Sequence, residues 1–142
     1  MNQQFETAWR LDRFFTDRGI PYAIIGGFAV QRWGQPRFTR DVDVTLLLPP
    51  GLREEAIARG VAYDLGDGRT VRLCSAEDLV IHKALAGRAQ DVLDIEGIVA
   101  RQGKALDVAY VRRWLTELGR VGDDSEVPAR FERIWAAIGP AG

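Results

Sequence analysis

A stretch in the first third of the chain constrains the fold most strongly, because short β-prone runs alternate there with glycine and proline breaks. Residues 21–25 are apolar and β-prone, and this run ends at Gly26-Gly27. Residues 28–33 then have the length and pattern of a short helix. Residues 41–48 begin with polar and apolar alternation and stop at two prolines, which is typical of a strand. The predicted order is strand, glycine turn, helix, strand.

The rest of the chain divides into a mixed first half and a helical second half. Beyond the elements above, we expect a helix at 5–18, a helix at 52–59, a hairpin at 62–73 that turns at 66–68, and helices at 79–87, 88–101, 107–118 and 128–138. This order predicts an α+β fold, with a small mixed β-sheet and a helical C-terminal half packed on it. We expect one domain over 1–142, with a sheet-containing core at 1–74 and a helical part at 75–142.

Composition excludes several classes of protein. A chain of 142 residues with 46% hydrophobic residues can bury one core without a disulfide or a structural metal. The single cysteine, Cys74, and the single histidine, His82, exclude an internal disulfide and a zinc site. No run approaches the ~18 apolar residues that span a bilayer, and residues 1–10 lack the apolar run of a signal peptide. We therefore expect a cytoplasmic protein with no membrane partner.

Asp41 and Asp43 are the first candidate site residues. They occupy positions i and i+2 of the predicted strand, so both carboxylates leave the same face, with Cα atoms roughly 6 to 7 Å apart. Two such acids can share a divalent metal ion, and Mg²⁺ prefers hard oxygen ligands supplemented by substrate phosphates. The pair predicts a metal site for Mg²⁺ or Mn²⁺.

Gly26-Gly27 complements these carboxylates. Between a strand and a helix, backbone N–H groups and the helix N-terminus can receive a triphosphate. Arg37 and Arg40 follow and can neutralise phosphate charge as a leaving group develops. These residues predict nucleotide binding.

This segment resembles the nucleotidyltransferase superfamily with the DNA polymerase β fold. Its signature is a strand, a Gly-Gly or Gly-Ser turn, a spacer and Asp-x-Asp; here Gly26-Gly27 and Asp41-Val42-Asp43 are separated by thirteen residues. The run from Ser75 to Leu115 is similar to the C-terminal part of the AbiEii/AbiGii-toxin-type nucleotidyltransferases. There a lysine, an arginine and two aspartates recur on consecutive helices.

Residue by residue, the recurring positions are Lys83, Arg88, Asp91 and Asp94. The resemblance implies catalytic roles for Lys83 and Asp91, beside Asp41 and Asp43, and nucleotide binding by Arg88. Each residue also has a plainer interpretation. Lys83 can be an exposed helix residue, Arg88 can pair with Asp91 on a helix surface, and Asp94 can anchor a helix packing contact.

A third carboxylate on a later strand normally completes the metal site in this superfamily. The segment that carries it is shortened here, so that only residues 49–74 separate the Asp-x-Asp strand from the helix that follows. Asp64 is the one acid well placed on a predicted strand of that segment, and no motif identifies it as the missing ligand. Without a third carboxylate, the metal that activates the nucleophile loses a ligand.

The resemblance implies an enzyme that transfers a nucleotide from an NTP to a hydroxyl of RNA or protein, within a toxin-antitoxin or phage-defence pair. An antitoxin is then the expected protein partner. The alternative is a degenerate, non-catalytic relative that binds nucleotide or a protein partner. A third possibility is an interaction module that forms a homodimer through an exposed edge strand.

Overall fold

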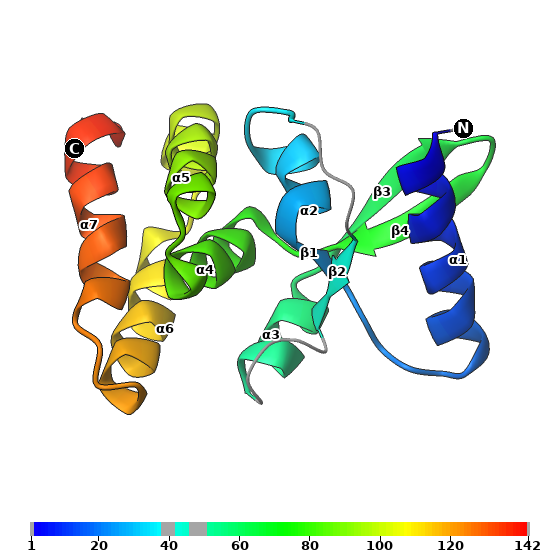
Figure 1. The fold of residues 1–142 in the computed structure, drawn as a ribbon, viewed down its shortest axis with the longest axis horizontal. Coiled ribbons are helices and arrows are strands. Elements are labelled where there is room, and N and C mark those ends of the chain that lie inside the picture. Colours follow the sequence, from blue (N-terminus) through cyan, green and yellow to red (C-terminus); the bar gives the residue numbers. More distant parts are fainter. Residues whose placement is uncertain (1, 38–41, 46–50, 142) are drawn as a thin grey trace. The chain divides into compact units, whose positions relative to one another are not determined.

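The computed structural model describes residues 2–37, 42–45 and 51–141. The elements follow the predicted order and confirm a mixed α+β fold with a small sheet and a helical C-terminal half (Figure 1). The first half contains α1 (Gln3–Asp17), β1 (Ile24–Ile25), α2 (Gly26–Trp33), β2 (Asp43–Val44), α3 (Leu52–Ala58), β3 (Val61–Gly66) and β4 (Arg69–Leu73). The second half contains α4 (Ala76–Ala86), α5 (Ala89–Gln102), a 3₁₀ turn (Gly103–Ala105), α6 (Val108–Val121) and α7 (Glu126–Ile138).

The described residues form two compact units. The first unit holds 2–29, 42–45 and 51–75, and the second holds 30–37 and 76–141. The division falls within α2, whose first half belongs to the first unit. The single domain expected for 1–142 stays a prediction.

The sheet of the first unit has the strand order β2-β1-β4-β3. β1 pairs antiparallel with β2, so that Ile25 lies opposite Asp43, and it pairs parallel with β4. β3 and β4 form the predicted antiparallel hairpin. All three residues of its turn, Gly66, Asp67 and Gly68, have positive φ angles, as a tight turn rich in Gly and Asp permits.

Aromatic side chains build the core of the first unit. Phe28 of α2 is 1% exposed and lies with Phe5 of α1 and Tyr63 of β3, with ring centroids 5.8 to 6.4 Å apart. Asn2 starts α1 by accepting a hydrogen bond from the Phe5 backbone N–H. Cys74 is fully buried, as is common for a cysteine outside a disulfide.

The second unit is a bundle of helices around α4. Apolar residues of α4, including Leu79 and Ile81, are fully buried, so α4 is a core helix rather than a surface one. Asp107 caps α6, because its carboxylate accepts the backbone N–H of Tyr110 at 3.1 Å. α4 begins at Ala76, three residues before the expected start at Leu79.

Three predicted boundaries in the first unit are wrong. The strand expected at 21–25 is limited to Ile24–Ile25. α2 begins at Gly26 rather than at residue 28, so both glycines belong to its first turn. Among the described residues, the strand expected at 41–48 is limited to Asp43–Val44, and Thr45 already leaves the extended conformation. Asp41 and residues 46–48 lie outside the described residues.

Within the described part of the chain, no helix is long and apolar enough to cross a membrane.

Candidate nucleotide site and a buried ion-pair network

Gly26 and Asp43 meet where β1 turns into α2. Gly26 has a φ of +73°, in the left-handed region that favours glycine. A Cβ atom at this position would lie 2.5 Å from Oδ2 of Asp43, because Asp43 pairs with Ile25 on the neighbouring strand. Glycine at residue 26 therefore allows the carboxylate of Asp43 to lie against the first residue of the helix.

The carboxylate of Asp43 is half-buried, and among the described residues it has no hydrogen-bond or ion-pair partner. An anionic group in such a position is stabilised by a cation or by helix N–H groups. Hard carboxylate oxygens suit Mg²⁺ or Mn²⁺, so the described part of this site fits the expected metal. The other expected ligand, Asp41, and the phosphate-neutralising Arg40 lie outside the described residues.

Asp64 does not lie beside Asp43. β2 and β3 are the two edges of the sheet, so three strand spacings, roughly 14 Å, separate them. The Asp64 side chain is exposed and accepts the backbone N–H of Gly66 at 2.7 Å, which supports the hairpin turn. In the described ranges, no group of three or more His, Cys, Asp or Glu side chains is arranged to hold a metal.

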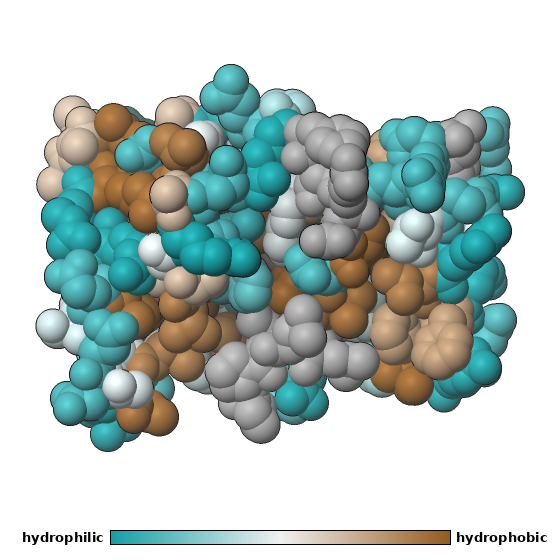
Figure 2. Space-filling view, in the orientation of Figure 1, coloured by the Kyte–Doolittle hydropathy of each residue, from teal (hydrophilic) through white to brown (hydrophobic). Residues whose placement is uncertain are grey.

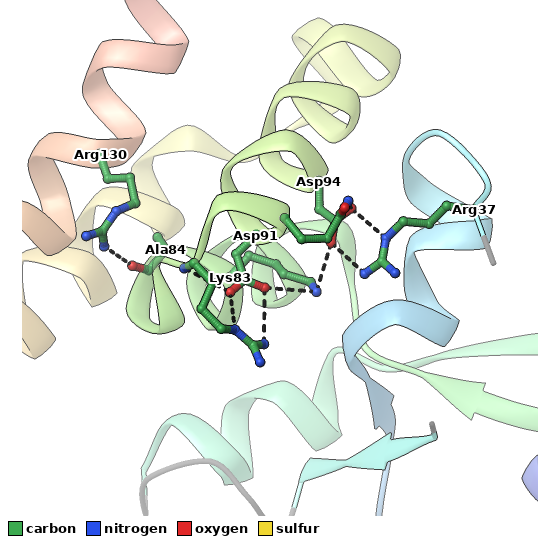
Figure 3. Close-up of polar contacts among 8 residues, drawn as sticks. Arg37, Lys83, Ala84, Asp91, Asp94 and Arg130 are labelled. Atoms are coloured by element: carbon green, nitrogen blue, oxygen red, sulfur yellow. Dashed lines mark hydrogen bonds and ion pairs between the residues drawn. The ribbon is translucent and has the colours of Figure 1, made fainter. Parts of the chain in front are cut away.

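The predicted residues of the second unit form one buried ion-pair network (Figure 3). The Lys83 ammonium lies 3.2 Å from Oδ1 of Asp91 and 2.9 Å from Oδ2 of Asp94. All three side chains are at most 4% exposed. The interpretation of Lys83 as an exposed helix residue is therefore wrong, because its stem and charge are enclosed.

Two arginines complete the network from the outside. Arg37 donates two hydrogen bonds to Asp94, both 2.8 Å long, and so ties the chain just after α2 to α5. The Arg88 Nε donates to Asp91 at 2.7 Å, and the Arg88 backbone N–H donates to the same oxygen at 3.0 Å. The side chain of Arg88 is 75% exposed and is thus the member of the network most open to solvent.

The network holds both aspartates in their charged form. Burial acts to raise the pKa of Asp91, but hydrogen bonds from Arg88 and then Lys83 outweigh it and lower that pKa. Burial acts in the same direction on the pKa of Asp94, where hydrogen bonds from Arg37, Gln90 and Lys83 again lower it. Fixed positive charge compensates both buried carboxylates.

Arg130 of α7 stabilises the junction between α4 and α5. Its guanidinium donates a 2.5 Å hydrogen bond to the Ala84 carbonyl, one of the last carbonyls of α4 (Figure 3). It also fills the space above Gly87, which precedes Arg88. The sequence pattern did not indicate this contact, because the partners are 46 residues apart.

A second polar cluster that the sequence analysis missed lies in the first unit. The buried Tyr22 hydroxyl donates a hydrogen bond to Asp12, whose other oxygen accepts two from Arg13. Asp12 is 7% exposed and lies one helical turn before Phe15, and in the sequence it resembles an ordinary polar helix residue.

A comparison of the chain with protein-family models and with curated proteins found no match.

Proposed function

We propose that the chain is a metal-dependent nucleotidyltransferase that binds an NTP at the turn between β1 and α2. The observation that carries this proposal is the contact between Gly26 and Asp43. Gly26 has a left-handed φ, and the absence of a Cβ there allows the unpartnered carboxylate of Asp43 to lie against the helix N-terminus. The carboxylate can bind a cation, and the N–H groups of the helix N-terminus can donate hydrogen bonds to phosphates. A nucleoside triphosphate with its divalent ion needs both.

In this proposal Asp43 and Asp41 hold Mg²⁺ or Mn²⁺, and the first-turn N–H groups at Gly26 and Gly27 bind phosphate oxygens. The ion, when bound, supplies charge neutralisation to the triphosphate. A hydroxyl of an RNA or protein acceptor loses its proton to solvent, attacks the α-phosphate and forms the new P–O bond, and pyrophosphate leaves with the electron pair of the broken bond. The residues contribute mainly by positioning the two reactants.

Lys83 and Asp91 carry a structural role in this proposal rather than direct transfer. The ammonium of Lys83 is enclosed by two carboxylates, so a substrate would have to displace one of them. Arg88 has the most exposed side chain of the network, and the nucleotide-binding role implied for it stays a prediction. Arg37 is engaged by Asp94, so we assign it to holding the chain after α2.

The test is a transfer assay with radiolabelled NTP, Mg²⁺ and mixed tRNA or protein acceptors. We expect labelled acceptor with the wild type and a loss of about a hundredfold or more with Asp43→Ala. Asp64→Ala is the matched control, because that carboxylate lies at the other edge of the sheet and supports only a hairpin turn. Equal transfer by the wild type and Asp43→Ala would sink the proposal.

A second candidate is a non-catalytic relative that binds nucleotide or a protein partner, such as an antitoxin. It is favoured by the position of Asp64, which leaves the expected third carboxylate unassigned. Calorimetry distinguishes the two candidates. Binding of NTP with Mg²⁺ and no labelled acceptor supports this second candidate, and turnover eliminates it. A cytoplasmic location and a homodimer remain predictions.

A further inference from the structure

An open cavity of about 420 Å³ lies in the first unit, between the end of α1, the turn that follows it and the end of α3. Its apolar walls are Ile20, Pro21, Ile57 and Ala58. Ile20 is 37% exposed, although large aliphatic side chains are more often buried. Figure 2 shows hydrophobic residues, in brown, reaching the surface around the lower end of α1. The volume lies within the range of small-molecule sites.

Asp12 also lines the cavity, and both oxygens of its carboxylate already accept hydrogen bonds. Asp12 accepts the Tyr22 hydroxyl on one oxygen and two N–H groups of Arg13, 3.0 and 3.2 Å away, on the other. Burial, and next the hydrogen bond to Asp12, raise the pKa of Tyr22, so its hydroxyl stays protonated and keeps donating to Asp12. A cationic ligand would have to displace these partners from Asp12.

Arg72, an exposed residue, also lines the cavity. Within the described ranges, its guanidinium has one partner, the Gly60 carbonyl, which accepts from Nη2 at 2.7 Å. A guanidinium carries five N–H donors, so most of them are left for another acceptor. No carboxylate of the described residues pairs with it. The cavity thus combines apolar walls with one cation that lacks a counter-ion there.

We propose that this cavity binds a small molecule in which a carboxylate is joined to an apolar body. The carboxylate receives hydrogen bonds from Arg72, whose planar fork matches its geometry. The apolar body lies against Ile20, Pro21 and Ile57. This site shares no residue with the turn at Gly26, so it stands independently of the proposed nucleotidyl transfer.

The probe is 3-phenylpropionate, titrated into the full chain by calorimetry and by NMR. Its neutral amide tests the charge, acetate tests the apolar body, and phenyl phosphate tests whether another oxyanion is accepted. We expect 3-phenylpropionate to bind at least about tenfold more tightly than the amide or acetate, the factor that one charged hydrogen bond provides. Equal affinity for acid and amide, or no binding at millimolar concentration, overturns the proposal.

Variants locate the binding. Arg72→Gln should weaken 3-phenylpropionate by about tenfold or more, whereas Arg72→Lys should retain part of the affinity. Ala58→Phe should abolish binding, because the exposed Ala58 lines the cavity and a phenyl ring fills it. Arg10→Gln is the control, since Arg10 is 79% exposed and pairs with Glu6 outside the cavity. Circular dichroism verifies each fold; unchanged affinity in both Arg72→Gln and Ala58→Phe contradicts the proposal.

Discussion

Lys83 places one ammonium group between two buried carboxylates, and each partner depends on it. Lys83→Met would leave Asp91 and Asp94 close together with reduced compensation. Breaking a buried pair by removing one partner costs about 3–5 kcal/mol. We therefore expect Lys83→Met to lower the free energy of unfolding by about that amount, measured by urea denaturation.

Arg112→Met is the matched control for Lys83→Met. Arg112 pairs with Glu132 at 2.7 Å, but both side chains are about half exposed. Exposed pairs of this kind contribute less than about 1 kcal/mol. Equal destabilisation by the two substitutions would mean that the buried Lys83 ion pairs contribute no more to the free energy of unfolding than an exposed ion pair does.

The same network predicts a pH dependence of stability. Hydrogen bonds from Arg88, Arg37 and Lys83 outweigh burial and lower the pKa of Asp91 and of Asp94 below the ordinary value of 3.8. Their contribution is fully present above that value and is lost as the pH falls below it. Asp94→Asn removes one of these groups, so its stability should decline less steeply in acid than that of the wild type.

Urea denaturation at a series of pH values from neutral down to about 3 measures this effect. The control is Asp64→Asn, because Asp64 is exposed and lies outside the network. A slope that is unchanged in Asp94→Asn, relative to both the wild type and the control, contradicts the assignment.

The turn between β1 and α2 is the element on which the proposed site depends. Gly26→Ala introduces a left-handed L-residue, which costs roughly 1–2 kcal/mol, and adds a Cβ 2.5 Å from the Asp43 carboxylate. Gly19→Ala separates the two effects. Gly19 has a similar φ of +65°, but a Cβ there would meet nothing within 4 Å.

We expect both glycine substitutions to lower the free energy of unfolding by the cost of the left-handed conformation. We expect Gly26→Ala alone to lose NTP binding as well. Thermal unfolding measures the first effect and calorimetric titration with NTP and Mg²⁺ measures the second. If Gly19→Ala weakened NTP binding as much as Gly26→Ala did, the contact between Gly26 and Asp43 would have no specific role.

Elements with strong local signals were predictable, because periodicity and capping act within a few residues. The helix at 5–18, the hairpin turn and the Asp107 cap all have such signals. The start of α2 was wrong, because glycine at residue 26 can enter a helix from a left-handed φ without a separate cap. The residue pattern alone does not show that the helix begins at a glycine with positive φ.

The contacts of the candidate site depend on packing between distant segments. Arg37 and Asp94 are 57 residues apart. Residue types at those positions indicated charge and chemistry, but not burial. The burial of Lys83 follows from its place on α4, a helix enclosed on most of its faces, which a single sequence does not distinguish from an amphipathic surface helix.

At the scale of the whole molecule, each of the two units has its own polar features. The first unit holds the turn and the carboxylate at which we propose that an NTP and its ion bind, and also the cavity lined by Arg72. The second unit holds a charge network whose solvent-facing member is Arg88. The net charge of -1 provides no overall attraction for a polyanion, so the proposed nucleotide binding depends on local groups.

The most direct test of this account is calorimetric titration of the full chain with NTP, with and without Mg²⁺. We predict binding that requires the divalent ion, that is lost in Asp43→Ala, and that is unchanged in Asp64→Ala. Binding of equal strength in the wild type and in Asp43→Ala, or binding that is indifferent to Mg²⁺, would contradict the assignment of the site at Gly26 and Asp43.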